Sequence, residues 1–530
     1  MPDPSPPLAR SAGLFGLATM ASRILGLVRD QVLAFYFGAG DAMDAFRVAF
    51  RVPNLVRDLF AEGAMSAAFV PTFTHELAVH GKPRAWRLAS RVITALALIT
   101  GGLVVAGTIV ADPLIRLFAS DFAEVPGKLE LTVGLARIML PFLTLVALAA
   151  VFMGMLNAMG HFFVPALSPA MFNVATIVIV VALVPLAPSI GIDAIVLVAI
   201  ATLIGGLGQL VVQWGPLRRE GYSYRPALDF DDPALRRVLF LMGPGTIGMA
   251  ATQINVLVNT QFAAGEGTGA VSWLDYAFRL MYLPIGLFGV SIAAASTPAL
   301  ARLAAEADRV RMRATIGAAI GLMLVLNIPA TIGLITLAVP IVALIFEHGR
   351  FTASDTLATA RALQFYAIGL VAYSVVRIVS PAFYALHLSR IPVTASVISV
   401  VTNIVFNAVL VKIMGYAGLA LGTSLAAIVN AAVQVLLLRR HLGGIEGAKI
   451  VVTFIKIAAA AVAMGAAAWS ADYWLTRMVP DQSIAFQAMR VAGAIGVGLA
   501  VLAAAAALLR VREFEEARNL VLGRLRRLSR

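Results

Sequence analysis

Cysteine is absent from this chain of 530 residues, and charged residues are scarce. The missing cysteines exclude disulfide bonds, thiolate metal sites and cysteine catalysis. Only 13% of the residues are Asp, Glu, Lys or Arg, against about 25% in an ordinary soluble domain. No stretch is long and polar enough to form a separate soluble domain. The composition therefore indicates an integral membrane protein without a soluble catalytic module.

Long apolar runs recur along the whole sequence, whose mean hydropathy is +0.90. They include residues 88–111, 164–188, 314–338 and 484–509. Each run can cross the roughly 30 Å of bilayer hydrocarbon as a helix, because a helix rises about 1.5 Å per residue. About 14 spans of this length fit into the chain. The predicted fold class is an all-α polytopic membrane protein.

The net charge of +13 is distributed unevenly over the loops between the expected spans. Lys82, Arg219 and Arg440 stand in basic loops, whereas Glu124 and Glu266 stand in the alternate, acidic loops. The positive-inside rule places the basic set in the cytoplasm. Both termini are then cytoplasmic and the number of spans is even. Since topology explains the excess charge, nucleic acid is not an expected partner.

The sequence contains a weak internal repeat. "VLAFYFGAGDAMDAFRVAFRVP" starts at Val32, and "VLVNTQFAAGEGTGAVSWLDYAFRLMYLP" starts at Val256. Such a repeat predicts two six-helix lobes of the same orientation, related by an axis along the membrane normal. The expected parts are a first lobe over 1–217, a second lobe over 218–440, two further helices over 441–510 and a basic cytoplasmic tail over 511–530.

Three charges stand near the middle of the first expected span, in "ASRILGLVRDQVLAF". Arg23, Arg29 and Asp30 would each cost about 2.5–3.5 kcal/mol if they faced lipid. They must therefore face protein or water. One interpretation is that such charges pair among themselves and fix helix packing.

The arginines of the first, second and eighth spans outnumber the nearby carboxylates, so pairing does not account for all of them. The surplus predicts a hydrated, cationic cavity between the two lobes, with arginines arranged to bind an anion such as phosphate. Asp44 is expected to cap its own helix, and Arg47 and Arg51 to lie at a solvated rim. The candidates are Arg23, Arg29, Arg57 and Arg279 for substrate binding; Asp30, Asp44, Glu62 and Asp275 for gating or charge pairing; and Ser22, Asn54, Gln253, Asn255 and Asn259 as polar cavity residues.

No pattern of residues indicates catalysis. The chain has no phosphate-binding glycine loop and no metal-ligand spacing, and its six histidines are scattered. We therefore expect a protein that is not an enzyme and that holds no metal or organic cofactor.

Six segments carry a resemblance to a known family. They are "SRILGLVRD", "FGAGDAMDAF", "RVPNLVRDLFAEGAMSAAFVP", "SWLDYAFRLMYLPIGLFGV", "EHGRFT" and "SPAFYA", in this order. Together they resemble the MurJ (MviN) family of lipid II flippases in the MOP exporter superfamily, over nearly the whole chain. Two positions depart from the family pattern: Phe278 stands where an acidic residue is frequent, and Asp58 where a basic one is common.

The resemblance implies a transporter that moves lipid II, an undecaprenyl-diphosphate-linked muropeptide, across the bacterial cytoplasmic membrane by alternating access. By position it implies cavity roles for Arg23, Arg29, Asp30, Arg57, Glu62 and Arg279, with Asp44 also matching. It also implies a groove for the lipid tail along the last two helices. Membrane lipids and cell-wall synthesis proteins are the other expected partners, and coupling to the membrane potential or to a monovalent ion stays open. The alternatives are an exporter of another polyprenyl-diphosphate glycan and a membrane scaffold for cell-wall enzymes.

The loop charges lead to a test of topology. Because the chain has no native cysteine, only an introduced cysteine can react with a thiol reagent. Single cysteines in the basic loops should be shielded from an impermeant thiol reagent in intact cells, whereas those in the acidic loops should react. The first group is Lys82→Cys, Arg219→Cys and Arg440→Cys; the second is Glu124→Cys, Glu266→Cys and Asp481→Cys. Labelling of Arg219→Cys from outside would reverse the orientation.

Overall fold

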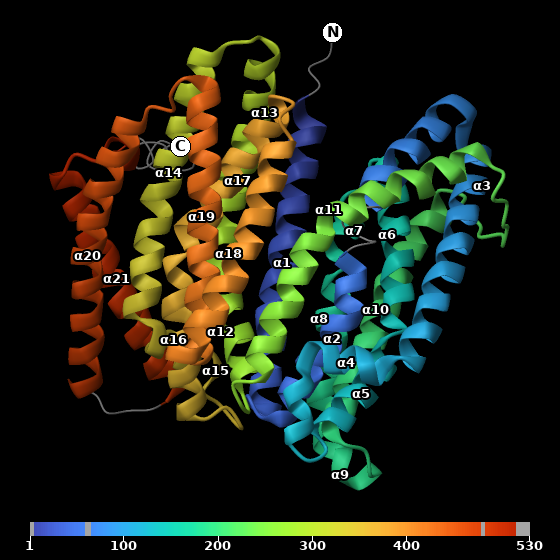
Figure 1. Cartoon of the computed structure of the whole chain (residues 1–530), viewed down its shortest axis with the longest axis horizontal. Helices are drawn as coiled ribbons and strands as arrows, with labels where there is room; N and C mark the ends of the chain where they lie inside the picture. The colour runs from blue at the N-terminus through green and yellow to red at the C-terminus, as the bar shows by residue number, and fades with distance from the viewer. Residues whose placement is uncertain (1–4, 59–64, 479–482, 516–530) are drawn as a thin grey trace. The chain divides into compact units, whose positions relative to one another are not determined.

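The computed structural model describes residues 5–58, 65–478 and 483–515, and all regular secondary structure in these residues is helical (Figure 1). By packing, the chain divides into unit 1, Met1–Ser272 with Gly349–Phe351, and unit 2, Trp273–His348 with Thr352–Arg530. The helices before the division are α1 (Ser5–Phe37), α2 (Asp41–Arg57), α3 (Met65–Ile109), α4 (Ala111–Ala119), η2 (Ser120–Glu124), α5 (Lys128–Met139), α6 (Phe142–Ala158), α7 (Phe163–Leu167), α8 (Ala170–Leu183), η3 (Val184–Leu186), α9 (Ala187–Ile190), α10 (Ala194–Arg219) and α11 (Pro233–Ala264). The later helices are α12 (Ala270–Pro284), the π-helical turn η4 (Ile285–Gly289), α13 (Val290–Ala305), α14 (Arg309–Thr336), α15 (Ala338–Phe346), α16 (Ala353–Ile368), α17 (Leu370–Ala385), α18 (Arg390–Met414), α19 (Tyr416–Leu442), α20 (Gly447–Met478) and α21 (Ile484–Leu508).

The all-α polytopic fold class is confirmed, but the count of 14 spans is not. Ten helical segments of the described chain are long and apolar enough to cross a membrane, or up to eleven if the bent pair α16 and α17 is one span. Three of the 14 expected spans are found neither among the ten segments nor in the bent pair, and they correspond to α1, α2 and α11. With 17 residues, α2 is shorter than the roughly 20 that a span needs, and α1 carries Arg23, Arg29 and Asp30 close together. The tail over 516–530 lies outside the described residues.

The core of unit 1 is held together by aromatic contacts between helices. The rings of Phe50, Phe142 and Phe172, from α2, α6 and α8, lie 5.6–5.7 Å apart between centroids. A Cβ on Gly205 of α10 would lie only 2.7 Å from the Cα of Phe172, so glycine is required for α10 to approach α8 this closely. These contacts fix the helices beside which α1 packs.

The connection from α10 to α11 folds back along α3. Burial raises the pKa of Tyr222 to about 12, so its hydroxyl stays protonated and shares a 3.3 Å hydrogen bond with Ser90. The hydroxyl groups of Tyr224 and Thr94 lie 3.0 Å apart in the same way. As a result α11 packs on α3 and α4 and belongs to unit 1. The division by packing thus falls after Ser272, and the repeat-based boundary at 217/218 stays a prediction.

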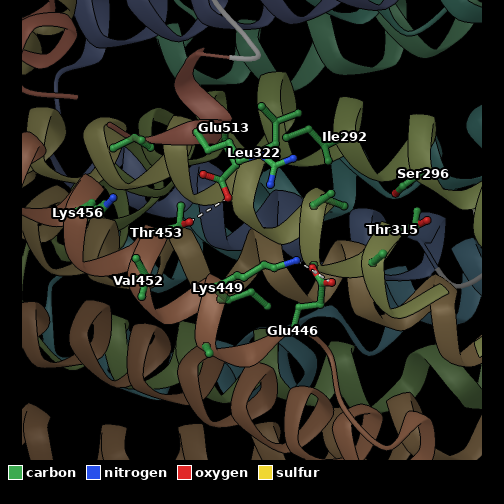
Figure 2. Close-up of a pocket in the computed structure, with 18 of the residues that line it drawn as sticks. Ile292, Ser296, Thr315, Leu322, Glu446, Lys449, Val452, Thr453, Lys456 and Glu513 are labelled. Atoms are coloured by element: carbon green, nitrogen blue, oxygen red, sulfur yellow. Dashed lines mark hydrogen bonds and ion pairs between the residues drawn. The ribbon is translucent and has the colours of Figure 1, made fainter. Parts of the chain in front are cut away.

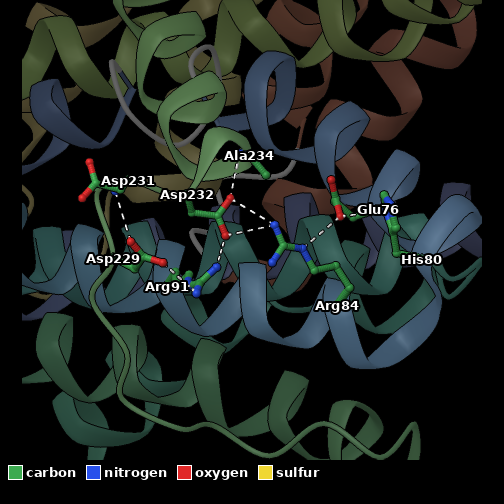
Figure 3. A network of polar contacts seen from close by, with 8 residues as sticks. All are labelled: Glu76, His80, Arg84, Arg91, Asp229, Asp231, Asp232 and Ala234. Atoms are coloured by element: carbon green, nitrogen blue, oxygen red, sulfur yellow. Dashed lines mark hydrogen bonds and ion pairs between the residues drawn. The ribbon is translucent and has the colours of Figure 1, made fainter.

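Asp232 anchors the start of α11 in a network of charges (Figure 3). Its carboxylate is almost fully buried, accepts a 2.8 Å hydrogen bond from the backbone N–H of Ala234 and forms ion pairs with Arg84 and Arg91 of α3. Arg91 also contacts Asp229 at 2.8 Å. One side chain therefore caps α11 and joins it to α3.

Unit 2 is built around α14, which packs against α13, α17 and α20. Met323, Ile378 and Phe383 are fully buried in its core. Helices α20 and α21 lie side by side, and α20 rests on α14 (Figure 1). A Cβ on Gly465 of α20 would meet Ile332 of α14 at 2.5 Å, so the two helices approach closely there. The last two described helices are thus an integral part of unit 2.

The Asp232 network predicts that alanine substitution destabilises the protein more at Asp232 than at the adjacent Asp231. Asp232→Ala leaves two arginines without their buried carboxylate and removes a helix cap, so the free energy of unfolding should fall by about 2 kcal/mol. Asp231→Ala is the matched control, because the Asp231 side chain is 92% exposed and pairs with the exposed Arg236. Its effect should stay below about 0.5 kcal/mol. The measurement is the thermal denaturation midpoint of each purified protein in detergent. Equal midpoints for the two variants would contradict the anchoring role.

Candidate functional site

The middle of α1 holds a buried ion pair between neighbouring residues. Nε and Nη2 of Arg29 donate to Oδ1 of Asp30 at 3.2 and 2.9 Å. Asp30 is 1% exposed and Arg29 is 9% exposed. The guanidinium carbon also lies 5.0 Å from the centre of the Phe172 ring on α8, a cation–π contact. Asp30 thus neutralises Arg29 and fixes the plane of its guanidinium.

Arg23 has a different environment, although the helical period places it on the face of Asp30. Its side chain is exposed in this structure. The preceding residue, Ser22, contacts α8, because its carbonyl accepts a 3.1 Å hydrogen bond from Nδ2 of Asn173. The face of α1 is therefore covered at Asp30 and open at Arg23, a difference that the helical period alone does not reveal.

The C-terminal end of α2 repeats the pattern of neighbouring charges. Nε and Nη2 of Arg57 donate to Oδ1 of Asp58 at 3.1 and 2.8 Å, and both side chains are partly exposed. The departure at Asp58 from the family pattern thus supplies Arg57 with a carboxylate. Asn54 is half-buried one turn earlier, and Glu62 lies outside the described residues.

The N-terminal end of α2 corrects two expectations. Arg47 is only 8% exposed, so it does not lie at a solvated rim. Asp44 does not cap its own helix, whose N-cap is Gly40. Instead it is fully buried and accepts hydrogen bonds from the start of α12: from the N–H of Gly269 at 2.7 Å and from the N–H and hydroxyl of Ser272 at 3.0 and 2.7 Å. The tertiary fold brings a second helix start, with its unpaired N–H groups, to this carboxylate.

Lys128 also contacts Asp44, although the sequence analysis did not identify it as a site residue. Its buried ammonium lies 3.2 Å from Oδ2 of Asp44, 2.7 Å from Oδ1 of Asp41 and 4.2 Å from the centre of the Phe122 ring. Burial acts to raise the pKa of Asp41, but hydrogen bonds from Lys128 and Thr268 outweigh it and lower the pKa. The only sequence signal for Lys128 is its place after Gly127 at a helix start, which does not indicate burial. Asp41, Asp44, Lys128, Gly269 and Ser272 form what we call the Asp44 cluster.

The polar residues of α11 also belong to unit 1. Gln253 is 7% exposed, and Asn255 and Asn259 are half-buried. They stand on the helix that follows the Asp232 network, and their role as polar cavity residues stays a prediction.

Two other candidate residues, Asp275 and Arg279, lie on α12 within unit 2. Nη2 of Arg279 lies 3.7 Å from Oδ2 of Asp275, one helical turn away. Phe278, the second departure from the family pattern, contacts the rings of Tyr282, Tyr366 and Tyr373 instead of a charge.

Arg377 of α17 is a second residue that the sequence analysis overlooked. It donates to the hydroxyl of Tyr282, and its guanidinium carbon lies 5.6 Å from the centre of that ring. An arginine on the apolar helix α17 adds a guanidinium to the side of α12 that carries Tyr282.

The chemistry of these groups is that of anion binding rather than bond cleavage. Guanidinium groups offer planar sets of donors to phosphate or carboxylate. Within the described residues, no group of three His, Asp or Glu side chains is placed to hold a metal ion.

Comparison with known proteins gives a consistent result. The family model "Lipid II flippase MurJ" matches residues 33–487. A protein of Vibrio cholerae described as a probable lipid II flippase MurJ is 34% identical over 518 residues, covering 95% of this chain and 97% of the relative. A protein of Rhizobium meliloti with the same description is 33% identical, covering 93% and 92%.

Solved structures agree. An inward-closed lipid II flippase MurJ superposes with a TM-score of 0.75 at 26% identity, covering 94% of this chain and 99% of that structure. An inward-facing multidrug transporter of the MATE family in the MOP superfamily has a TM-score of 0.67 at 18% identity, covering 82% and 98%, which supports the fold alone. The chain therefore belongs to the family of lipid II flippases called MurJ.

Proposed function

We propose that this protein moves lipid II from the inner to the outer leaflet of the bacterial cytoplasmic membrane by alternating access. The observation that carries the proposal is the family match over residues 33–487, together with relatives that align over nearly their whole length. Both termini are cytoplasmic in this proposal, in line with the alternation of loop charges.

The diphosphate of the substrate is held by arginines in this mechanism. Arg23 is suited to the first contact, because its side chain is exposed. Arg29, Arg57 and Arg279 each have a carboxylate on their own helix or its cap. A guanidinium has five N–H donors, so an arginine can bind a diphosphate while it stays paired with its carboxylate, and neither charge is left bare in the membrane.

The Asp44 cluster acts as a conformational contact rather than as a substrate site. Asp44 ties the start of α12 to α2 through three hydrogen bonds and to α5 through Lys128. It stabilises the present conformation, and its hydrogen bonds to Gly269 and Ser272 break when α12 moves.

The arginine assignment predicts loss of transport without loss of protein. Arg23→Ala should weaken binding of purified protein to lipid II about 10- to 100-fold, the effect of losing a hydrogen bond to a charged group. Arg23→Lys should recover binding only in part, because lysine lacks the planar fork. Arg29→Ala and Arg279→Ala should also fail to complement a strain depleted of its flippase. The control is Arg116→Ala, an exposed arginine paired with Asp112 outside the site.

Arg29 needs a second variant, since its loss exposes the buried Asp30 to an apolar environment. Asp30→Asn keeps the shape of the pair and should retain or strengthen lipid II binding.

In depleted cells, lipid II should accumulate on the inner leaflet, whereas loss of another surface glycan would indicate a different polyprenyl-diphosphate substrate. Wild-type complementation by the triple variant Arg23→Ala, Arg29→Ala, Arg279→Ala would overturn the transport mechanism and favour a scaffold.

The Asp44 cluster predicts energetic coupling between distant residues. Asp44→Ala and Ser272→Ala should each lower stability, and the double variant should lose about 1–2 kcal/mol less than the sum, because both remove the same hydrogen bonds. Asp44→Ala combined with Ser296→Ala, a residue outside the cluster, should be additive. The coupling is measured from the thermal denaturation midpoints of the purified single and double variants. Additivity of Asp44→Ala with Ser272→Ala would show that the contact carries no energy.

A further inference from the structure

Two features of the structure lie outside the charged groups of the candidate site. One is a cavity of about 1190 Å³ in unit 2, bordered by α13, α14, α20 and the segment after α21 (Figure 2). Because it lies along the last two helices, it belongs with the tail of the lipid that the proposed function transports. The other is the segment "EHGRFT", residues 347–352, which the arginine mechanism leaves without a role.

The middle of this segment, Gly349–Phe351, packs in unit 1, although the helices on both sides of it, α15 and α16, belong to unit 2. We call these three residues the strap. The backbone N–H of Arg350 donates to the carbonyl of Phe35 at 2.9 Å, and Phe351 is 2% exposed. Phe35 lies in the last turn of α1, where the carbonyls lack partners within the helix. The strap therefore supplies a donor to the end of the helix that carries the buried ion pair.

Two glycines make this close contact possible. Gly38, directly after α1, has a φ of +63°, and Gly349 has a φ of +64°, so both are left-handed. A Cβ on Gly38 would lie 2.5 Å from the carbonyl oxygen of Arg350, and a Cβ on Gly349 would collide with the carbonyl oxygen of Phe35. A side chain at either position would thus push the strap away from α1.

Asp355 of α16 holds the chain where it leaves the strap. Its Oδ2 accepts hydrogen bonds from the N–H and the hydroxyl of Thr352 at 2.9 and 2.8 Å, as part of the capping box of α16. Its Oδ1 accepts a 2.8 Å hydrogen bond from Nε1 of Trp273. A capping box is complete without this last bond, so the bond to Trp273 has another role.

The chain passes from unit 1 to unit 2 between Ser272 and Trp273, and again between Phe351 and Thr352. Asp355 binds the first residue of unit 2 at both places. On the other side of each peptide bond, Ser272 is held by the Asp44 cluster and Phe351 belongs to the strap. A continuous path of hydrogen bonds and short backbone segments thus runs from the end of α1, through the strap and Asp355, to the start of α12.

We propose that the strap and Asp355 couple the end of α1 to the start of α12, so that these two arginine-bearing helices move together. When α12 leaves Asp44, the coupling makes α1 follow. Arg29 of α1 and Arg279 of α12 then keep their donors in place for the same anion, as catalysis and binding by several groups require. Asp355, Trp273 and the strap are positioning residues, because they act through the two helices. The role in anion binding rests on the proposed function, whereas the coupling of the helices does not.

The test is double electron–electron resonance between spin labels at Ile24→Cys on α1 and Leu283→Cys on α12, two exposed positions in a chain without native cysteine. Without lipid II, the labelled protein should give one narrow distribution of distances. Trp273→Phe, which leaves the capping box intact, should broaden this distribution, and so should Gly349→Ala. The two changes together should broaden it no further than the larger one alone, because both interrupt the same path.

The matched control for the strap is Gly191→Ala. Gly191 has a φ of +67°, but a Cβ there would have nothing within 4 Å, so this variant has the backbone strain without the collision. The control for the indole is Trp474→Phe, at an exposed tryptophan of α20. Both controls should keep the narrow distribution, and thermal midpoints verify that every variant is folded.

Binding of purified protein to lipid II gives a second measurement. Trp273→Phe should weaken binding about fivefold, at the lower end of usual couplings between sites. A narrow distribution in folded Trp273→Phe protein, or equal broadening by Gly349→Ala and Gly191→Ala, would overturn the proposal. If the distribution broadens as expected but even wild-type protein fails to bind lipid II, the coupling stands and the proposed function is refuted instead.

Discussion

The cost of a bare charge in hydrocarbon is the constraint on which this structure depends. A single lysine, arginine or aspartate facing lipid at mid-membrane depth costs several kcal/mol, yet α1, α2 and α12 carry such residues. The structure meets the constraint by pairing. Arg29 pairs with Asp30, and the buried Lys128 pairs with Asp44 and Asp41.

The described ion pairs are of two kinds, and the difference matters for a protein that changes shape. Arg29 with Asp30 and Arg279 with Asp275 lie within one helix, so each helix can move with its charge compensated. By contrast, the Asp44 cluster and the Asp232 network join the start of one helix to a different helix. Charge pairs within a helix permit motion of that helix, and contacts between helices select a conformation.

Much of this was predictable from the sequence, because membrane proteins obey simple rules of length and charge. Apolar runs of sufficient length predicted the helices, and the six family segments predicted the flippase relationship that the comparisons confirm. The expectations for Asp44 and Arg47 were wrong for a common reason. Both residues were judged from their own helix, whereas their surroundings come from the start of α12 and the packing of unit 1.

The sequence by itself determined the fold class, the family and which helices carry charge, because hydrophobic length and local spacing are properties of adjacent residues. Only the tertiary structure decided which of two residues on one face, Arg23 and Asp30, is exposed and which is buried. It also placed Lys128 against Asp44, 84 residues away, and brought α14 and α20 together with the segment after α21 around one cavity. Burial and partners between remote segments depend on the packing of helices, and helix packing is a property of the whole chain.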